Sequence, residues 1–272
     1  MARPLRIEFA GAFHHVMARG NARQSIFRGV PDREAFLGVL KRVCGRFDWR
    51  VWAYCLMDNH YHLLVETLEP TLSRGMREIN GIYTQTFNRR HARMGHVFQG
   101  RYKSLLIDKD AYLLEVSRYI VLNPVKANIC RGAADYRWSS YRQTIGQATA
   151  PNWLVVDEVL KLFSRDRGRA RQAYRKFVME GGVMVDPFVK AGGGILGDES
   201  FIAKVTRNLK RPSREIPRKQ RVWKSLASFE REAKHRDEAI RTAYESGDFT
   251  LTQIGDHFGL HYATISRIAR AV

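Results

Sequence analysis

The feature that most constrains the fold is the apolar stretch at residues 49–67, WRVWAYCLMDNHYHLLVET. Its two halves are strand-like, and Asp58 and Asn59, two residue types that favour turns, separate them. We therefore expect two strands, at 49–57 and 61–67, joined as a hairpin. A hairpin with so few polar residues must be covered by other elements, so the sequence predicts a central position for it in a sheet.

Two histidines, His60 and His62, interrupt this hairpin. Side chains alternate between the faces of a strand, so both imidazoles would point to one face and Tyr61 to the other. Two imidazoles on one face can hold a metal ion, although histidines are also common as ordinary structural groups. We favour the metal site because a polar side chain in a central strand needs a reason. His14 and His15 are adjacent and would face opposite ways, so we expect them to be structural.

The pattern around the hairpin predicts a sheet with helices. Two further strands are expected at 12–19 and 100–107. Helices are expected at 31–47, at 70–90 and at 108–124, the last opened by an aspartate and ended by Pro124. The order β-α-β-β-α-β-α is typical of an α+β fold, a ferredoxin-like antiparallel sheet with helices on one face.

Beyond the first 148 residues the composition changes. We expect helices at 155–163 and 169–181, a loop at 190–200 and a basic, proline-broken linker at 207–221. A helix at 231–247 is followed by two shorter helical patterns with Gly259 between them, the spacing of a helix-turn-helix. The sequence thus predicts three parts, at 1–148, 149–219 and 220–272.

The charge of the chain points to a polyanionic partner. Lys and Arg total 46 against 27 Asp and Glu, a formal net charge of +19. Nucleic acid is the leading candidate, ahead of an anionic membrane surface, for which we see no long basic amphipathic helix. No signal peptide or run of transmembrane length is evident. The three cysteines are few and widely spaced, which favours reduced thiols in the cytoplasm over a disulfide framework or a zinc finger.

One helix carries a candidate nucleophile. Tyr119 and Asn123 are one turn apart and share a face of the helix expected at 108–124. If that face lies over the histidine strand, a nucleophile and a third polar ligand would meet the two imidazoles. The alternative is that both residues belong only to the buried stripe of an amphipathic helix.

Four motifs resemble those of the single-tyrosine HUH transposases, in particular their REP-associated branch. The motifs are DNHYHLLV at 58–65, SRYIVLNPVKANI at 117–129, FHHVMARGNARQSIF at 13–27 and VFQGRYKSLLI at 97–107. The resemblance covers roughly residues 5–145. It departs mildly at Tyr61, because that position is formally hydrophobic in the family.

The resemblance implies a function. Residues 1–148 would be an HUH catalytic domain in which His60, His62 and Asn123 bind Mg²⁺ or Mn²⁺. Tyr119 would attack a phosphodiester of single-stranded DNA and leave a 5′-phosphotyrosine and a free 3′-hydroxyl. The chain would thus nick and rejoin DNA at hairpin repeats, as a transposase does. Tyr112, two turns earlier on the same helix, is the competing nucleophile.

Binding of DNA needs positive charge and flat side chains for stacking. The candidates in the first part of the chain are Arg19, Arg23, Arg28, Arg74, Arg77, Arg89, Arg90, Arg101 and Lys103, interleaved with Phe27, Tyr83, Phe87, Phe98 and Tyr102. Each of these is also compatible with a solvated charge or a core aromatic. In the helix-turn-helix, the residues expected to contact DNA are Tyr262, Thr264, Ser266 and Arg267.

Two other functional classes remain open. One is a sequence-specific DNA-binding regulator that keeps the transposase fold without catalysis. The other is a metal hydrolase of the barrel type, which the early change of pattern disfavours. In the favoured interpretation the partner is single-stranded or hairpin DNA, in the cytoplasm and associated with the nucleoid, with no membrane and no small organic cofactor. Both a monomer and a homodimer are compatible with the resemblance.

Overall fold

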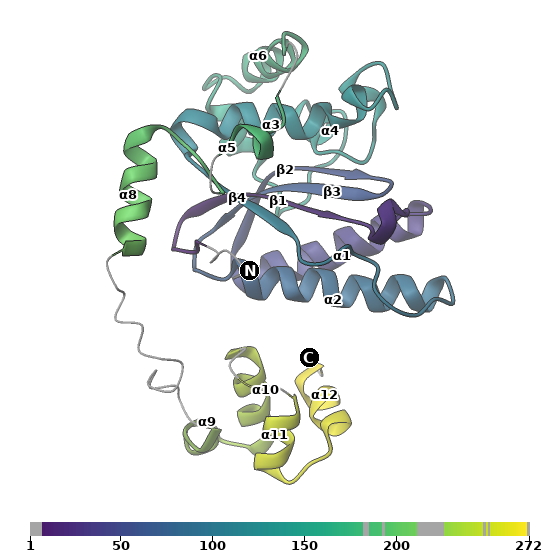
Figure 1. Cartoon of the computed structure of the whole chain (residues 1–272), viewed down its shortest axis with the longest axis vertical. Coiled ribbons are helices and arrows are strands. Elements are labelled where there is room, and N and C mark those ends of the chain that lie inside the picture. Colours follow the sequence, from purple (N-terminus) through teal and green to yellow (C-terminus); the bar gives the residue numbers. More distant parts are fainter. Residues whose placement is uncertain are drawn as a thin grey trace. The chain divides into compact units, whose positions relative to one another are not determined.

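Most of the expected strands and helices form close to the predicted positions (Figure 1). The computed structural model describes residues 7–181, 185–191, 194–210, 226–246, 249 and 251–270, and the chain divides into two units at residues 210 and 211. The first unit begins with β1 (Ala12–Arg19), α1 (Val30–Phe47), β2 (Trp49–Met57), β3 (His60–Thr67), α2 (Leu72–Arg90), β4 (Lys103–Ile107) and α3 (Lys109–Lys126).

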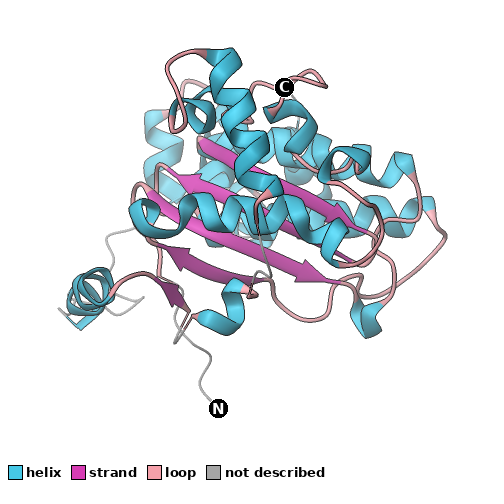
Figure 2. Cartoon of the chain, turned by 90° about the horizontal axis from the view of Figure 1, so that it is seen from above, coloured by secondary structure: helices cyan, strands magenta, loops and turns pink. Residues whose placement is uncertain are grey.

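The strands form one sheet in the order β2-β3-β1-β4-β5 (Figure 2). The first four strands pair antiparallel with their neighbours, which is the ferredoxin-like arrangement that the sequence predicted. The strand β5 (Ile195–Leu196) was expected to be part of a loop and instead pairs parallel with β4. Both of its side chains are buried, so the gain from covering apolar surface accounts for this short edge strand.

Helices α1 and α2 cover one face of the sheet and α3 covers the other (Figure 1), so the expectation of helices on one face was wrong, because β3 buries side chains on both of its faces. On the first face, Tyr61 packs against Phe36 of α1 and donates a hydrogen bond to Asn80 of α2, 2.7 Å away. On the second face, the ring of His62 lies against the ring of Tyr119 on α3. The alternation of side chains along β3 therefore separates an apolar layer from a layer that contains the histidines.

Helix α3 begins as predicted and ends later than predicted. The Asp108 side chain accepts a hydrogen bond from the backbone of Asp110, which caps the first turn. Pro124 was expected to end the helix but lies inside it, and the helix continues to Lys126. Proline lacks only its own N–H, so a proline in the last turn removes one hydrogen bond without stopping the chain from completing that turn.

The helical extension packs on the same core as the sheet. It contains η2 (Ala133–Asp135), α4 (Tyr141–Thr144), α5 (Val156–Lys161), α6 (Arg167–Met179), α7 (Pro187–Lys190) and α8 (Glu199–Lys210). Leu154 forms a parallel bridge with Val51 of β2, and Tyr174 and Val178 of α6 are buried in the core of the sheet. Of the basic linker expected at 207–221, the first four residues belong to α8 and the others lie outside the described residues.

The second unit has a core of its own. Its helices are α9 (Leu226–Glu232), α10 (Arg236–Ser246), α11 (Leu251–Phe258) and α12 (Tyr262–Arg270). The helix expected at 231–247 is broken, because the Glu238 side chain accepts a hydrogen bond from the backbone of Lys234 and so starts α10 afresh. Gly259 has φ of 64° in the turn between the last two helices, a conformation that favours glycine.

The cysteines and the apolar helices bear on two expectations from the sequence, that the thiols are reduced and that no segment spans a membrane. All three cysteines are free, and two of them, Cys44 and Cys55, are buried. No helix in the described ranges combines the length and the apolar character that crossing a bilayer requires.

Candidate active site

The two histidines of β3 lie side by side on the face of the sheet that α3 covers. The ring centroids of His60 and His62 are 5.0 Å apart, and the rings are nearly perpendicular. Their strand lies between β2 and β1, the central position that the sequence predicted. His62 is buried, whereas His60 begins the strand and is partly exposed. The pair is therefore held by the sheet at His62 and accessible to solvent at His60.

Tyr119 and Asn123 of α3 both turn toward this face. The ring centroid of Tyr119 is 5.8 Å from that of His62. The Asn123 amide donates a hydrogen bond to the Tyr119 carbonyl at 2.9 Å and also lies within hydrogen-bonding reach of its hydroxyl. Both side chains are buried, so the alternative interpretation as a packed stripe is correct as well. Tyr119 thus packs in the core and meets His62, and Asn123 lies beside Tyr119.

The tautomer of His60 is determined by its neighbour. Asn59 donates its amide N–H to the Arg23 carbonyl, so its other terminal atom is the acceptor oxygen. Nδ1 of His60 lies 2.7 Å from that oxygen and must carry the proton. The lone pair of neutral His60 is then on Nε2, the atom that a metal ion would bind.

His15 belongs to the site, although we expected it to be structural. Its Nε2 lies 2.9 Å from Nδ1 of His62, and its ring lies 5.9 Å from that of Tyr119. If Nδ1 of His62 donates in this hydrogen bond, Nε2 of His62 is free to bind a metal ion. No periodicity in the sequence could reveal this contact, because it depends on the register between β1 and β3.

All three imidazoles are held neutral near pH 7. Burial, with a contribution from the Arg19 guanidinium, lowers the pKa of His60 to about 4. Burial lowers the pKa of His15 to about 3, and burial together with the neighbouring histidines holds the pKa of His62 well below its usual value. Neutral imidazoles are the form that binds metal ions.

The donors present fit a small divalent cation. Among the described residues there is no cluster of three His, Cys, Asp or Glu side chains placed to hold a metal. A site here would need the amide oxygen of Asn123 as the third ligand beside His60 and His62. Imidazole and amide oxygen together suit Mn²⁺, and Mg²⁺ accepts the oxygen more readily than the nitrogens.

Asp186 is a second residue that the sequence did not single out. Its carboxylate lies within hydrogen-bonding reach of the Tyr119 hydroxyl. Burial and this carboxylate raise the pKa of Tyr119 above its usual value, so the phenol is protonated at neutral pH. Asp186 lies 67 positions beyond Tyr119 in a segment without regular periodicity, which is why no pattern in the sequence could place it here.

A cavity of about 500 Å³ opens beside Tyr119. Its wall is mostly apolar and joins α3 to the extension, with Leu122 on one side and Val178 and Gly181 on the other. Lys126 and Arg131 add positive charge to the lining. Tyr119 is only 5% exposed, and its side chain forms part of the lining of this cavity.

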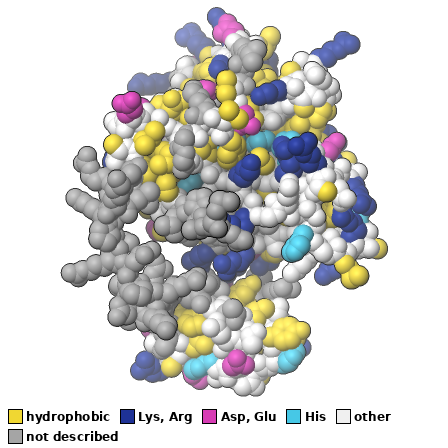
Figure 3. All heavy atoms as spheres, viewed as in Figure 1, with side chains coloured by type: hydrophobic (Ala, Val, Ile, Leu, Met, Phe, Trp, Pro, Cys, Tyr) yellow, Lys and Arg dark blue, Asp and Glu magenta, His cyan; other side chains and the backbone are white. Residues whose placement is uncertain are grey.

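The predicted DNA-binding residues of the first unit do not form one patch. Arg19 pairs opposite His60 across the strands, and its charge acts on the pKa values of His60, His62 and Tyr119. Lys103 lies on the same face of the sheet, Arg23 is exposed in the short 3-10 helix η1 (Asn21–Arg23), and Arg28 and Arg101 are exposed in loops. Arg74 and Arg77 lie on α2, which covers the opposite face. Figure 3 shows Lys and Arg side chains distributed around the visible face of this unit.

The aromatic residues suggested for base stacking have another role. Phe27, Tyr83, Phe87, Phe98 and Tyr102 are all buried in the main core. Phe27 and Tyr83 lie against Phe36, and Phe98 lies against Tyr61, with ring centroids 5.3 to 6.0 Å apart. The stacking interpretation is therefore wrong for these five residues, and the core interpretation holds.

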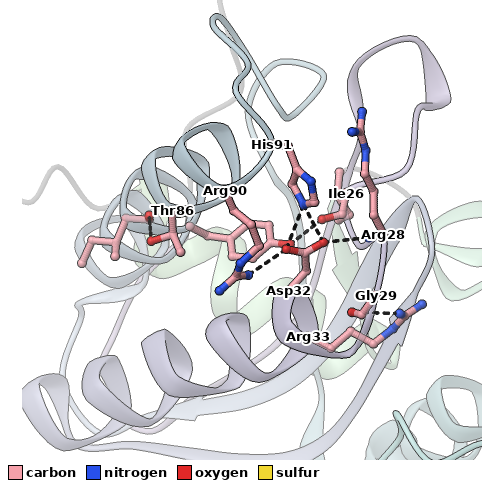
Figure 4. Close-up of polar contacts among 10 residues, drawn as sticks. Ile26, Arg28, Gly29, Asp32, Arg33, Thr86, Arg90 and His91 are labelled. Atoms are coloured by element: carbon pink, nitrogen blue, oxygen red, sulfur yellow. Dashed lines mark hydrogen bonds and ion pairs between the residues drawn. The ribbon is translucent and has the colours of Figure 1, made fainter.

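A buried carboxylate joins the ends of α1 and α2. Figure 4 shows Arg90, His91 and the backbone of Arg28 converging on Asp32. The three donor atoms lie 2.7, 2.9 and 2.9 Å from its oxygens. Arg90, one of the proposed DNA contacts, is therefore engaged in an ion pair inside the protein.

In the second unit the predicted contact residues lie on α12. Tyr262 and Arg267 are exposed, whereas Thr264 and Ser266 are partly buried. Ile265 is fully buried between them and anchors the helix to α10 and α11. The exposed surface of this helix is thus available to a partner, and its binding to DNA stays a prediction.

Comparison with known proteins gives a family and two similar structures. Residues 10–123 match the family model described as "Transposase IS200 like". A solved REP-associated tyrosine transposase bound to a REP hairpin is 18% identical, with a TM-score of 0.48, and the match covers 56% of this chain and 89% of that chain. A putative transposase from Deinococcus radiodurans R1 is 13% identical, with a TM-score of 0.32 and coverages of 44% and 95%. No curated protein sequence matches the chain.

Proposed function

We propose that this chain is an IS200-like transposase, the family whose model matches its residues 10–123, and that this domain cleaves and rejoins single-stranded DNA with Tyr119 as the nucleophile. The observation that carries the proposal is the contact of Tyr119 with His62 on the face of the sheet that α3 covers. A phenol beside two neutral imidazoles is the set of groups that a metal-assisted attack on a phosphodiester requires.

His60, His62 and Asn123 would hold the divalent cation, Mg²⁺ or Mn²⁺. A bound cation supplies charge that polarises the phosphate and offsets the negative charge that develops during attack. The protein contributes the orientation of these ligands. Asn59 sets the tautomer of His60, and His15 holds the ring of His62.

The attack by Tyr119 would release a 3′-hydroxyl and leave a 5′-phosphotyrosine. Phenolate is a better leaving group than an alkoxide, because the usual pKa of the tyrosine phenol, near 10, is several units lower than that of an alcohol. The covalent bond therefore conserves the energy of cleavage, and a second 3′-hydroxyl can reverse it. This reversal is the strand-transfer step expected of a transposase.

Hairpin DNA with a single-stranded flank is the substrate that we propose. The motifs at 13–27 and 97–107 resemble the REP-associated branch, for which repeated palindromes are the implied target. The net charge of +19 and the position of Arg19 beside the histidines support an anionic backbone as the ligand. The second unit would add contacts to the duplex through Tyr262, Thr264, Ser266 and Arg267 of α12.

A trapped protein–DNA adduct tests the proposal. A 5′-phosphotyrosine retains the fragment on the 3′ side of the cut, so a single-stranded hairpin labelled at its 3′ end is incubated with Mn²⁺ and resolved under denaturing conditions. We expect the wild-type chain to form a labelled adduct and Tyr119→Phe to form none while it still binds DNA. Tyr112→Phe is the matched control and should still form the adduct.

Each other result has a defined meaning. An adduct that persists in Tyr119→Phe and disappears in Tyr112→Phe would reverse the assignment of the nucleophile. An adduct that forms equally well after chelation with EDTA would contradict the role of a metal. Tight binding of the hairpin without any adduct would favour the non-catalytic regulator.

A further inference from the structure

We propose that the cavity between α3 and the helical extension binds the nucleobase of the first nucleotide on the 3′ side of the cut. This inference rests on the proposed function and deepens it, because it assigns a subsite to one nucleotide of the substrate. The far wall of the cavity comes from residues 131–181, outside the region that matches the transposase family. The inference stands on the position of the cavity, on its chemistry and on the covalent bond that Tyr119 would form.

The cavity borders the proposed nucleophile. Tyr119, Leu122 and Lys126 follow one another at helical spacing on α3, and all three line the cavity. Asn123 lies on the adjacent stripe of the same helix, beside Tyr119. The side chain of Tyr119 therefore belongs to two surfaces, since its ring contacts His62 and also lines the cavity. A nucleotide joined to Tyr119 would lie next to this cavity.

The opposite wall of the cavity is held against α3. Arg118 donates a hydrogen bond to the Phe177 carbonyl at 3.3 Å, and its guanidinium lies 4.4 Å from the centre of the Phe177 ring. A Cβ on Gly181 would lie 2.8 Å from Cδ of Arg118, so glycine allows the chain to pass close to α3. Val178 and Tyr141 of the wall are buried. The cavity is thus formed before any ligand binds, as is usual for sites that bind small organic groups.

The lining of the cavity suits a flat aromatic ring. Its volume of about 500 Å³ falls within the range of about 300–1,000 Å³ that is typical of ligand pockets. Among the lining residues that the structure describes, only the two tyrosines and the two cations carry side-chain oxygen or nitrogen atoms. Such a wall covers the faces of a base by apolar contact and offers few side-chain partners to its edge. The subsite therefore accepts a base because it is flat, and it distinguishes only weakly among the four bases.

Positive charge lies at the open side of the cavity. Lys126 and Arg131 are exposed, and Met179 of the same lining is 81% exposed. The Nζ atom of Lys126 lies 5.3 Å from the centre of the Tyr119 ring. A nucleotide whose base is inside the cavity has its phosphates outside, where these cations attract them. The charge therefore favours a nucleotide over an uncharged apolar ligand.

The covalent bond determines which nucleotide occupies the cavity. A 5′-phosphotyrosine joins Tyr119 to the 5′ phosphate of the fragment on the 3′ side of the cut, and one sugar separates that phosphate from the first base. This nucleotide stays attached to Tyr119 throughout the intermediate, so its base is the one nearest to the cavity. Entry of a base from a single strand costs less than entry of a base from a duplex, because no base pair is broken.

The experiment removes the base from the DNA and leaves the full-length protein unchanged. A 5′-labelled copy of the hairpin first locates the cut from the length of the released fragment. The 3′-labelled hairpin is then made with an abasic site at the first or at the third nucleotide beyond the cut. The rate of adduct formation is measured with Mn²⁺ and with DNA below saturation, so that the rate reports the binding of DNA as well as the reaction.

We expect the abasic site at the first nucleotide to slow adduct formation by about 10-fold or more, the effect typical for loss of one stacked base. The abasic site at the third nucleotide is the matched control, and its rate should stay within about threefold of that of the intact hairpin. Exchange among the four bases at the first position should change the rate less than about 10-fold, because every base has a flat face.

Leu122→Trp places an indole in the cavity and tests the location of the base. The intact hairpin should then react about 10-fold more slowly, and removal of the first base should cause little further loss, because both changes remove the same interaction. Leu114→Trp is the control, since Leu114 lies on the same helix, is also partly exposed and is outside the lining. It should keep the wild-type response to the abasic site. Thermal unfolding checks that both variants fold.

Two results would overturn the inference. Equal rates for the intact hairpin and for the hairpin without the first base, in the wild-type protein, would show that this base is not bound. A folded Leu122→Trp that keeps the wild-type rate, or that slows both DNAs by the same factor, would show that the base binds elsewhere. Either result leaves the proposed function intact, provided that the wild-type chain forms the adduct and Tyr119→Phe does not.

Discussion

At the residue scale, the hydrogen bond from His60 to Asn59 gives a test of the metal site that spares its ligands. Removal of a partner that orients a metal-binding imidazole typically weakens metal affinity 10- to 100-fold. We expect Asn59→Ala to raise the Mn²⁺ concentration for half-maximal cleavage by about 10-fold or more. His60→Ala and His62→Ala should abolish cleavage while DNA binding, which the basic surface supplies, persists.

The control is His96→Ala, because His96 is exposed and lies outside the site. Titration of cleavage with Mn²⁺ and a separate binding assay in EDTA distinguish the two effects. Equal Mn²⁺ requirements in wild type and Asn59→Ala would mean that the amide does not orient the imidazole.

The buried carboxylate of Asp32 leads to a second prediction at this scale, on how the free energy of unfolding depends on pH. Burial alone would raise the pKa of its carboxyl, but hydrogen bonds from Arg90, the Arg28 backbone and His91 hold the pKa below its usual value. A depressed pKa stabilises the fold above the unfolded-state pKa, and this contribution is lost as the pH falls through the folded-state pKa. We expect Asp32→Asn to cost about 2 kcal/mol at pH 7.

The difference in the free energy of unfolding between the wild type and Asp32→Asn should shrink below about pH 4, where the carboxyl of the unfolded chain becomes protonated. Urea unfolding at pH 7 and at about pH 3.5 measures it. A difference that stays constant over this range would mean that the charge of Asp32 contributes nothing and that only its shape matters.

At the scale of an element, helix α2 contains two glycines with opposite roles. A Cβ on Gly75 would lie 2.2 Å from Cζ2 of Trp49, whereas a Cβ on Gly81 meets no atom within 4 Å. The indole of Trp49 cannot move easily, because its Nε1 donates a hydrogen bond to Thr71 at 3.0 Å. Gly75 therefore allows α2 to approach β2 closely.

We expect Gly75→Ala to destabilise the first unit by about 1–3 kcal/mol through overpacking. Gly81→Ala should stabilise it by up to about 1 kcal/mol, since alanine is the better helix former. Urea unfolding of both variants gives the sign of each change in the free energy of unfolding. A stabilising Gly75→Ala would show that the contact with Trp49 relaxes without cost.

At the scale of the whole molecule, the two units divide the work of binding and cleavage in our proposal. Affinity for DNA falls with salt in proportion to the number of phosphates contacted. A chain that ends at Lys210, the last residue of the first unit, should bind the hairpin more weakly and with a smaller salt slope. It should still form the adduct at high DNA concentration, because Tyr119 and the histidines remain.

The matched full-length variant is Arg267→Ala, which removes one exposed cation from α12 and should lower the salt slope by about one unit. Affinity measured at several salt concentrations gives the slopes. Identical slopes for the truncated and intact chains would exclude the second unit from DNA binding.

The local pattern of residues was sufficient to predict most of the architecture. Periods of two and of about 3.6 residues located the strands and helices of the first unit and their order along the chain, because each element needs one apolar face. The same logic placed His60 and His62 on one face of a strand and Tyr119 and Asn123 on one face of a helix. These predictions depend only on neighbours within a few residues, which is why the sequence alone could make them.

Only the tertiary structure decided what lies opposite those faces. The contact of His15 with His62 follows from the register between two strands, and Asp186 reaches Tyr119 through a segment with no periodicity of its own. The same holds for the aromatic residues, whose exposure or burial depends on how α2 packs against the sheet. Contacts between distant segments are selected by the packing of the whole core, and no local pattern encodes them.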